Sequence, residues 1–447
     1  MLPLGLLGAF VFSALALMAG SASAAEVHVF SGSFGAGELS LGEHSGVAVN
    51  QGTGDVYVAD TGNGRVAEFS PAGTFVRGFG GPTEPTFVAV DNSAGASKGD
   101  VYVADTATAT VAKFDAEGNP VTSWGTGGVL DGSTAPTGTF KTIFGIAVDS
   151  TGVLVVYAEP GEGGTLERFG QDGSFVGEVT SPFGPRTAGL AVDSTGNYYL
   201  ARAEEPGPTA KVGPSGEPLA EFIDPGPTTG PTTDDTDVYV SHSDHVSRYD
   251  AAGTLLESFG AAQLTGGAGV AIAADGTAYV ADSASDQIDV FESVLVPDVK
   301  TEAATALTRT AATLNGTIGA AGGPEAECRF EYTTQAQFEA EGFTGATILA
   351  CVPPGPFTGS GQEAVTAAAA GLEVGTAYRF RLVGENENGA NPNNAAGGSL
   401  GFETAPAVRV EPTEATAVLR GSATLNGTVT PEGGRSRSLR IRIRQPG

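Results

Sequence analysis

Cysteine, basic residues and long apolar runs are all scarce in this chain of 447 residues. The only cysteines are Cys328 and Cys351, and their region contains no histidine, so it does not supply the ligands of a metal site. Lysine and arginine number 22 against 51 acidic residues, which gives a formal net charge of −29. An acidic surface repels phosphate backbones, so we expect no nucleic-acid partner. Beyond residues 4–18, no segment could span a bilayer.

The short motifs of several enzyme classes are also absent. The chain has no Gly-Lys-Ser/Thr phosphate-binding loop and no His-Glu-x-x-His zinc motif. We therefore assign no catalytic, cofactor-binding or metal-binding residue, and we expect no cofactor.

The first 25 residues have the pattern of a secretory signal peptide. An apolar run, 4–18, is followed by the small residues Ala19 to Ala25, although no Lys or Arg precedes the run. Cleavage is expected after Ala24 or Ala25. We therefore predict a secreted or cell-surface protein with no membrane span in the mature chain.

A unit of about 40 residues recurs through the first two-thirds of the sequence. Its cleanest copy contains four short β-prone runs, at 46–49, 54–60, 64–69 and 73–80, which are separated by Gly, Asp, Asn or Pro. Four strands per repeat of this length are typical of a β-propeller blade. The fold class is therefore all-β.

Six copies can be distinguished, and they predict a six-bladed propeller over 26–293. In the second copy the fourth strand is expected at 121–124, and the fifth copy has no clear first strand. The sixth copy stops one strand short. Residues 27–35 read like a fourth strand with no blade before it, so this N-terminal strand is expected to complete the sixth blade and close the ring.

The stretch at 56–66, Val-Tyr-Val-Ala-Asp-Thr-Gly-Asn-Gly-Arg-Val, resembles the central motif of the NHL-repeat family of six-bladed propellers. Asp105 and Asp282 repeat the acidic position of Asp60. The resemblance covers about 26–293 and implies a recognition role. Some NHL propellers bind RNA through a basic face, which this acidic chain does not offer.

A different unit begins beyond a predicted linker at 294–300. Strand-like runs at 301–405 predict an immunoglobulin/fibronectin-like β-sandwich. Leu372, Thr376 and Tyr378 resemble the Leu-x-x-x-Thr-x-Tyr corner of fibronectin type III domains. In an exported chain, Cys328 and Cys351 are expected to form a disulfide, with two free thiols as the alternative.

Residues 406–447 form a partial second copy of this unit. The segment 421–429 repeats 310–318, but the likeness ends after Gly434. The last thirteen residues contain five arginines and no acidic residue. A basic tail can bind nucleic acid or an anionic surface. We favour a truncated or frameshifted gene.

Candidate ligand-binding residues lie where the second strands end. Asp60, Asp105 and Asp282 either form a ring of carboxylates or cap their own hairpin turns, and the turn cap is the simpler interpretation. Glu159, Arg202 and His242 replace the aspartate in other copies, so we expect specificity there. With Asp244, His242 and His245 could contribute to a zinc site, but no fourth ligand is in view and we favour an exposed hairpin tip as the explanation.

Two classes of function remain open. The first is an exported binding or scaffold protein that recognises a protein, peptide or glycan. The second is a metal-dependent propeller enzyme, similar to gluconolactonase-like hydrolases or peptidyl-amidating lyases. Asp91, Asp149 and Asp193, at the ends of first strands, could hold a cation, but turn caps again explain them more simply. A third, weaker possibility is a purely structural surface protein.

Overall fold

The computed structural model describes residues 25–81, 83–132, 142–159, 164–182, 187–202, 209–222, 228–391, 398–420, 422–431 and 437–444. Within these ranges the protein consists mainly of β-strands, and none of the helices is long and apolar enough to cross a membrane. The chain divides into two compact units between Val294 and Leu295. We call them the propeller unit and the C-terminal unit. Apart from Ala25, the expected signal peptide at 1–25 lies outside the described residues.

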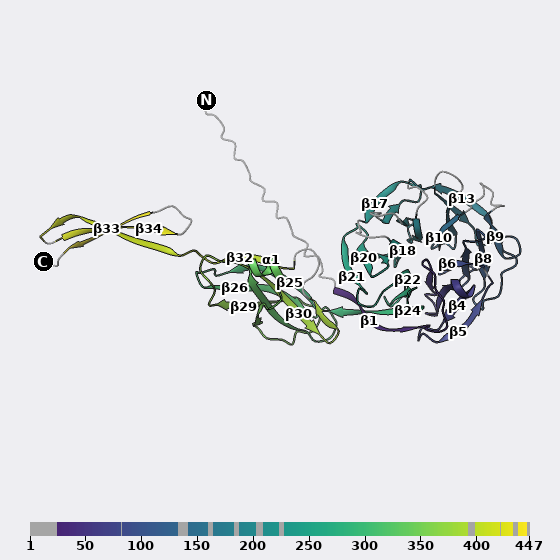
Figure 1. Ribbon diagram of the computed structural model, residues 1–447, viewed down its shortest axis with the longest axis horizontal. Coiled ribbons are helices and arrows are strands. Elements are labelled where there is room, and N and C mark those ends of the chain that lie inside the picture. Colours follow the sequence, from purple (N-terminus) through teal and green to yellow (C-terminus); the bar gives the residue numbers. More distant parts are fainter. Residues whose placement is uncertain are drawn as a thin grey trace, which may run out of the picture. The chain divides into compact units, whose positions relative to one another are not determined.

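The propeller unit consists of four-stranded antiparallel sheets arranged in a ring (Figure 1). In its described residues the sheets are β2 (Val47–Val49), β3 (Val56–Asp60), β4 (Arg65–Phe69), β5 (Phe75–Phe79); β6 (Pro85–Val90), β7 (Val101–Asp105), β8 (Thr110–Phe114), β9 (Val129–Asp131); β10 (Thr142–Val148), β11 (Leu154–Glu159), β12 (Thr165–Phe169), β13 (Phe175–Thr180); β14 (Thr187–Val192), β15 (Tyr198–Arg202), β16 (Thr209–Val212), β17 (Pro218–Phe222); β18 (Thr228–Thr233), β19 (Asp237–His242), β20 (Val246–Asp250), β21 (Leu255–Phe259); and β22 (Gly267–Ile272), β23 (Ala278–Asp282), β24 (Gln287–Val296), β1 (Ala25–Phe34).

The ring is continuous because each innermost strand contacts the next. Strands β2, β6, β10, β14, β18 and β22 follow one another in this way, and β22 contacts β2. The second strands β3, β7 and β23 are buried along their whole length, as expected for sheets that are covered on both faces. The N-terminal strand β1 pairs with β24, as the sequence predicted.

Two sequence-based expectations about strands were wrong. The fifth sheet has a first strand after all, β18, which was missed because Thr-Thr-Gly-Pro-Thr-Thr contains no aliphatic or aromatic residue. In the second sheet the fourth strand is β9, not 121–124. Trp124 lies in the turn before β9, where its buried ring packs edge-to-face on Tyr102 at 5.5 Å. The large aromatic residue marked a packing position rather than a strand.

Charged residues fasten β1 to the fifth sheet. The Nδ1 atom of buried His28 lies 2.8 Å from a carboxylate oxygen of Glu257, and the Glu257 side chain also accepts a hydrogen bond from the His28 backbone N–H at 2.7 Å. Arg248 donates to Asp237 at 2.7 Å and to the carbonyl oxygen of Glu26 at 3.0 Å. We call these five residues the clasp.

The C-terminal unit begins with two sheets that share one apolar core. One sheet contains β25 (Asp298–Thr305), β26 (Ala311–Gly319) and β29 (Glu363–Ala370). The other contains β27 (Glu327–Thr334), β28 (Thr347–Ala350), β30 (Ala377–Asn386), β31 (Gly389–Asn391) and β32 (Leu400–Glu403). A short helix, α1 (Gln335–Glu341), lies between β27 and β28. Of the expected linker 294–300, only Pro297 lies outside a strand.

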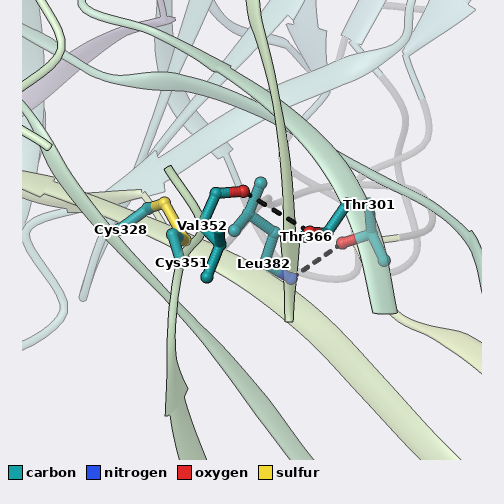
Figure 2. The surroundings of a disulfide bond; sticks show 6 residues. All are labelled: Thr301, Cys328, Cys351, Val352, Thr366 and Leu382. Atoms are coloured by element: carbon teal, nitrogen blue, oxygen red, sulfur yellow. Dashed lines mark hydrogen bonds between the residues drawn. A yellow bond between two sulfur atoms is a disulfide. The ribbon is translucent and has the colours of Figure 1, made fainter. Parts of the chain in front are cut away.

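The expected disulfide is present, between Cys328 in β27 and Cys351 just after β28 (Figure 2). Beside it, the Thr366 side chain of β29 approaches the Val352 carbonyl oxygen, and Thr301 of β25 accepts a hydrogen bond from the Leu382 N–H at 2.9 Å. Each of these contacts joins one sheet to residues of the other, so the disulfide lies within the packed sandwich.

The resemblance at the corner also has a structural counterpart. Leu372 is buried, and the Tyr378 hydroxyl accepts a hydrogen bond from the Glu373 backbone N–H at 2.9 Å. A tyrosine that bonds to backbone a few residues upstream in this way fixes the corner of an immunoglobulin-like sandwich.

The remaining strands form a separate three-stranded sheet, with β33 (Val408–Leu419), β34 (Ser422–Pro431) and β35 (Arg437–Arg444) in that order. The internal repeat extends to a hydrogen-bonding detail. The Asn315 amide donates to the Ala303 carbonyl at 2.7 Å across a register shift, and the Asn426 amide donates to the Glu414 carbonyl at 2.8 Å across the same shift. The sheet β33–β35 therefore begins as a copy of β25–β26.

The clasp generates a first prediction. Arg248→Met leaves the buried Asp237 carboxylate without its cation, so the free energy of unfolding of the propeller unit should fall by about 3 kcal/mol. Urea unfolding followed by the fluorescence of Trp124, the only tryptophan, measures this unit specifically. Lys98→Met, at an exposed position, is the control. A loss below about 1 kcal/mol would contradict a stabilising role for the clasp.

The disulfide generates a second prediction. The double variant Cys328→Ser/Cys351→Ser releases a loop with a sequence separation of 23, which should destabilise the C-terminal unit by about 3 kcal/mol. Calorimetry should show one transition moving to lower temperature, while unfolding monitored at Trp124 stays unchanged. A shift of the Trp124 transition instead would show that the two units do not unfold independently.

Candidate functional site

The innermost strands surround a central channel with an apolar wall. Its described lining includes Val47, Val88, Ile146, Leu190 and Val270, one from each of five inner strands. Glycine within several of these strands permits the close packing. A Cβ at Gly145 would lie 2.7 Å from the backbone nitrogen of Leu190 on the next inner strand, so a larger residue would push the strands apart.

At one end the channel opens into a polar cavity of about 560 Å³, which we call the mouth. The mouth is formed by the loops that follow the inner strands, together with the start of β1. Its described lining contains six carboxylates and no lysine or arginine. These carboxylates are Glu26, Asp149, Asp193, Asp234, Asp235 and Asp275.

Most of these aspartates close the hairpin turn in which they lie. Asp149 accepts hydrogen bonds from the backbone N–H groups of Thr151 and Val153 at 2.9 and 3.0 Å. Asn50, at the matching position of the first sheet, accepts from Gly52 in the same way at 2.9 Å. The turn therefore needs a side-chain oxygen but not a negative charge, and the charge at Asp149 is available for another purpose.

Basic residues approach some of these carboxylates from outside the mouth. Arg168 lies 3.6 Å from Asp149, and Lys211 lies 3.7 Å from Asp193. Burial acts to raise the pKa of Asp193, but hydrogen bonds from Thr195 and Asn197 outweigh it and leave the pKa below its ordinary value. Asp193 is therefore ionised at neutral pH.

The opposite face of the propeller lies where the second strands end. Asp60 accepts from the Ser40 N–H at 2.8 Å and binds Arg65 at 2.7 Å. Asp105 accepts from Thr108 at 3.1 Å, and Asp282 accepts from Ala284 at 3.1 Å. All three carboxylates are buried. Asp105 and Asp282 accept from backbone N–H groups of their own turns, so the turn-cap interpretation fits these two better than a ring of ligands. Asp60 instead holds the neighbouring segment at Ser40 and the Arg65 side chain.

The divergent candidates occupy matching positions on this opposite face. Glu159, Arg202 and His242 each pair with the first residue of the adjacent inner strand. The side chains of Glu159 and Arg202 lie outside the described residues. His242 is buried rather than exposed, and its ring stacks on that of His245 at 4.3 Å. His245 in turn contacts Asp244 at 2.7 Å, in an exposed hairpin tip.

Among the described residues, no group of three or more His, Cys, Asp or Glu side chains is arranged to hold a metal ion. Asp289 of β24 is a buried carboxylate with a strongly shifted pKa. Burial, together with the charge of Asp282, raises the pKa of Asp289 from 3.8 to about 6. One of its oxygens accepts from Gln287 at 3.0 Å, and the other has no hydrogen-bond partner among the described residues.

Sequence reasoning missed the mouth as a unit. Its residues come from loops distributed around the ring, and Asp149 and Asp193 had been recognised only as residues that could hold a cation or, more simply, cap their turns. The available signal was the recurrence of an acidic residue just after most of the first strands. Asp234 and Asp235 follow β18, which was not recognised as a strand, so the full set could not be assembled before the ring was known.

Comparison with known proteins supports the repeat but names no function. Residues 45–69 match the family model described as NHL repeat. No curated protein matches the sequence. Solved structures that are similar include a gluconolactonase from Xanthomonas campestris (13% identity, 60% of this chain and 99% of that chain, TM-score 0.46). An aldose sugar dehydrogenase from Streptomyces coelicolor follows (16% identity, 60% and 99%, TM-score 0.44).

A protein of unknown function from Bacteroides caccae is also similar (14% identity, 51% of this chain and 82% of that chain, TM-score 0.41). Identities this low say nothing about activity. The chain contains an NHL repeat within a β-propeller, and its chemistry must be inferred from its own residues.

Asp289 generates the third prediction. Its folded-state pKa of about 6 exceeds the ordinary value of 3.8, so its contribution to stability is most favourable at low pH and is lost as pH rises through 6. Asp289→Asn removes the buried charge. At pH 8 the variant should be more stable than the natural protein by about 1 to 2 kcal/mol, and this gain should shrink at pH 4.5. Urea unfolding monitored at Trp124 checks both values. A gain that is equal at the two pH values contradicts the shift.

Proposed function

We propose that this protein is an exported or cell-surface binding protein. A six-bladed NHL-type propeller recognises the ligand, and the following fibronectin type III-like unit acts as a spacer. The observation that carries the proposal is the mouth, a cavity of about 560 Å³ with six carboxylates and no basic residue in its described lining.

The chemistry of the mouth favours a ligand with positive charge. Carboxylates around a concave, partly desolvated surface focus a negative potential, which attracts cations and raises their association rate. A protein or peptide segment rich in lysine or arginine meets this requirement, and a neutral glycan does not use it. Below the carboxylates, the channel wall of Val, Ile and Leu residues can accept an apolar side chain.

The opposite face provides a second surface for recognition. His242 and His245 lie there, together with the strand ends of Glu159 and Arg202, where the sheets differ in sequence. If a ligand bound mainly to this face, substitutions at the mouth would leave its affinity unchanged. The two faces can therefore be distinguished by mutation.

Other features support export and the spacer role. A disulfide such as Cys328–Cys351 persists in oxidising compartments. The Tyr378 corner supports a fibronectin type III-like assignment for the sandwich.

The fourth prediction tests the mouth with a fluorescein-labelled nonapeptide of alternating lysine and glycine. Asp149→Asn/Asp235→Asn/Asp275→Asn removes three charges but keeps the turn oxygens. Asn50 shows that asparagine is compatible with such a turn, and asparagine tolerates the positive φ of 75° at Asp235. Fluorescence anisotropy at low salt should show binding to the natural protein and an increase in Kd of roughly tenfold or more for the variant.

Glu84→Gln, an exposed carboxylate on the opposite face, and His245→Ala are the controls, and each should leave Kd unchanged. No binding to the natural protein, or an equal loss with Glu84→Gln, contradicts recognition at the mouth. A loss with His245→Ala alone assigns recognition to the opposite face.

A further inference from the structure

A second cavity of the propeller unit lies beside the segment that connects the sheet β2–β5 to the sheet β6–β9. Its volume is about 580 Å³. We call it the side cavity. The apolar part of its described lining consists of Gly80, Gly81, Val103, Ala112, Phe114 and Val129.

The surroundings of this connecting segment recur at two other junctions between sheets. At each junction, a fourth strand ends in Phe-Gly, and this Phe packs on a Phe of the third strand in the next sheet. The ring centroids are 4.9 Å apart for Phe34–Phe69, 5.3 Å for Phe79–Phe114 and 5.1 Å for Phe259–Phe291. The three junctions therefore begin in the same way.

The connecting segments also end in the same way. In each, the backbone N–H of a Ser or Thr donates to the aspartate at the end of a second strand. The N···O distances are 2.8 Å for Ser40 to Asp60, 2.5 Å for Thr83 to Asp105 and 3.3 Å for Thr265 to Asp282. The residues between these two fixed points can therefore be compared position by position.

The segment at the side cavity is two residues shorter than the others and has no leucine. Four residues separate the glycine from the Ser or Thr in 35–40 and 260–265, but only two do so in 80–83. The last of the four is Leu39 or Leu264, and these leucines are only 5 and 3% exposed.

Each leucine fills the space between the glycine and the aromatic ring of its junction. A Cβ on Gly35 would lie 2.6 Å from the Leu39 side chain and 3.5 Å from Phe69. The corresponding residues of the third junction, Gly80 and Phe114, both line the side cavity. The side cavity therefore includes the position that a leucine side chain occupies at the other two junctions.

The chemistry of the side cavity favours an uncharged group. Its described lining has two charged residues, and both have partners already. The ammonium group of Lys113 lies 3.0 Å from Asp100, and Asp105 also accepts from the Thr108 N–H at 3.1 Å. The hydroxyl groups of Thr108 and Thr110 lie at the rim, where they can bond to the backbone of a ligand.

We infer that the side cavity binds a leucine side chain presented by a peptide segment of another molecule. The occupants of the two matching positions, Leu39 and Leu264, are leucines on peptide segments of this chain, so the surrounding surface is shaped for such a group. A cavity of about 580 Å³ can hold residues next to the leucine as well. Recognition here is apolar, so it does not depend on the cationic ligand proposed for the mouth.

The fifth prediction uses the peptide Ala-Ala-Gln-Leu-Thr-Gly, the sequence of 261–266, with fluorescein at its N-terminus and an amide at its C-terminus. Fluorescence anisotropy should show binding to the full chain. The same peptide with alanine in place of leucine should bind at least about tenfold more weakly. Ala112→Leu fills the side cavity and should weaken binding of the leucine peptide by a similar factor. Ala72→Leu, in an exposed turn before β5, is the control.

Three results would overturn the inference. They are no binding with protein up to about 1 mM, equal Kd values for the two peptides, and equal effects of Ala112→Leu and Ala72→Leu. The variant Asp149→Asn/Asp235→Asn/Asp275→Asn should bind the leucine peptide as tightly as the natural protein does, because the peptide carries no basic side chain. A loss of binding in that variant would assign the peptide to the mouth instead.

A loop graft tests the shape of the side cavity within the chain itself. Replacing residues 81 and 82 by Ala-Ala-Gln-Leu gives this segment the length and sequence of 261–264, and the matched graft is Ala-Ala-Gln-Ala. The leucine graft should have an unfolding equilibrium constant at least about tenfold below that of the alanine graft, and it should no longer bind the peptide. Urea unfolding monitored at Trp124 measures the difference. Equal stabilities would show that the side cavity does not hold a leucine side chain.

Discussion

The pairing of β1 with β24 is the interaction on which the propeller unit depends. A four-stranded sheet made from consecutive strands needs no distant partner, but the sixth sheet takes its outermost strand from the beginning of the chain. This pairing covers an edge that would otherwise be free to pair with another chain. The pairing also places Glu26 in the lining of the mouth and His28 within hydrogen-bonding distance of Glu257. The mouth and the clasp therefore both depend on closure of the ring.

The acidic residues of this chain stabilise its turns as well as giving its surface a negative charge. Many of its aspartates accept backbone hydrogen bonds at the turns of successive sheets, as Asp149 does near the mouth and Asp105 on the opposite face. Such turns need only an acceptor oxygen, as Asn50 demonstrates. Repetition of one turn around a ring therefore gathers negative charge at the mouth as a by-product, and this charge becomes available for binding.

Much of the fold could be predicted from the sequence because its determinants are local and repeated. The strands, the closing segment and the Tyr378 corner follow from short patterns, and the Cys328–Cys351 pair was predicted from the expectation of export. Strand β18 could not be predicted, because its burial depends on neighbours rather than on its own threonines and proline. The strand expected at 121–124 was wrong for a related reason. Trp124 is buried in a turn, and a buried aromatic residue in a turn cannot be told from one in a strand by its residue type.

The candidate site was harder to predict than the fold. The carboxylates of the mouth come from loops of different sheets, and only the ring brings them together. His28 and Glu257 are 229 positions apart, and no local pattern selects that partner among 51 acidic residues. The fold was easier to predict than the site for a physical reason. A turn or a strand is determined by a few consecutive residues, whereas the mouth is assembled from loops all around the ring, and no single loop determines it.

The same closure sets the order in which the molecule can be made. Strand β1 is the first part of the propeller to be synthesised, and its partner β24 is the last. During synthesis, the first strand must wait unpaired until nearly the whole ring has emerged. Long-range pairing of this kind slows folding and exposes sheet edges while the chain is incomplete. Completion of the ring is therefore the step that covers the last free edge of the sixth sheet.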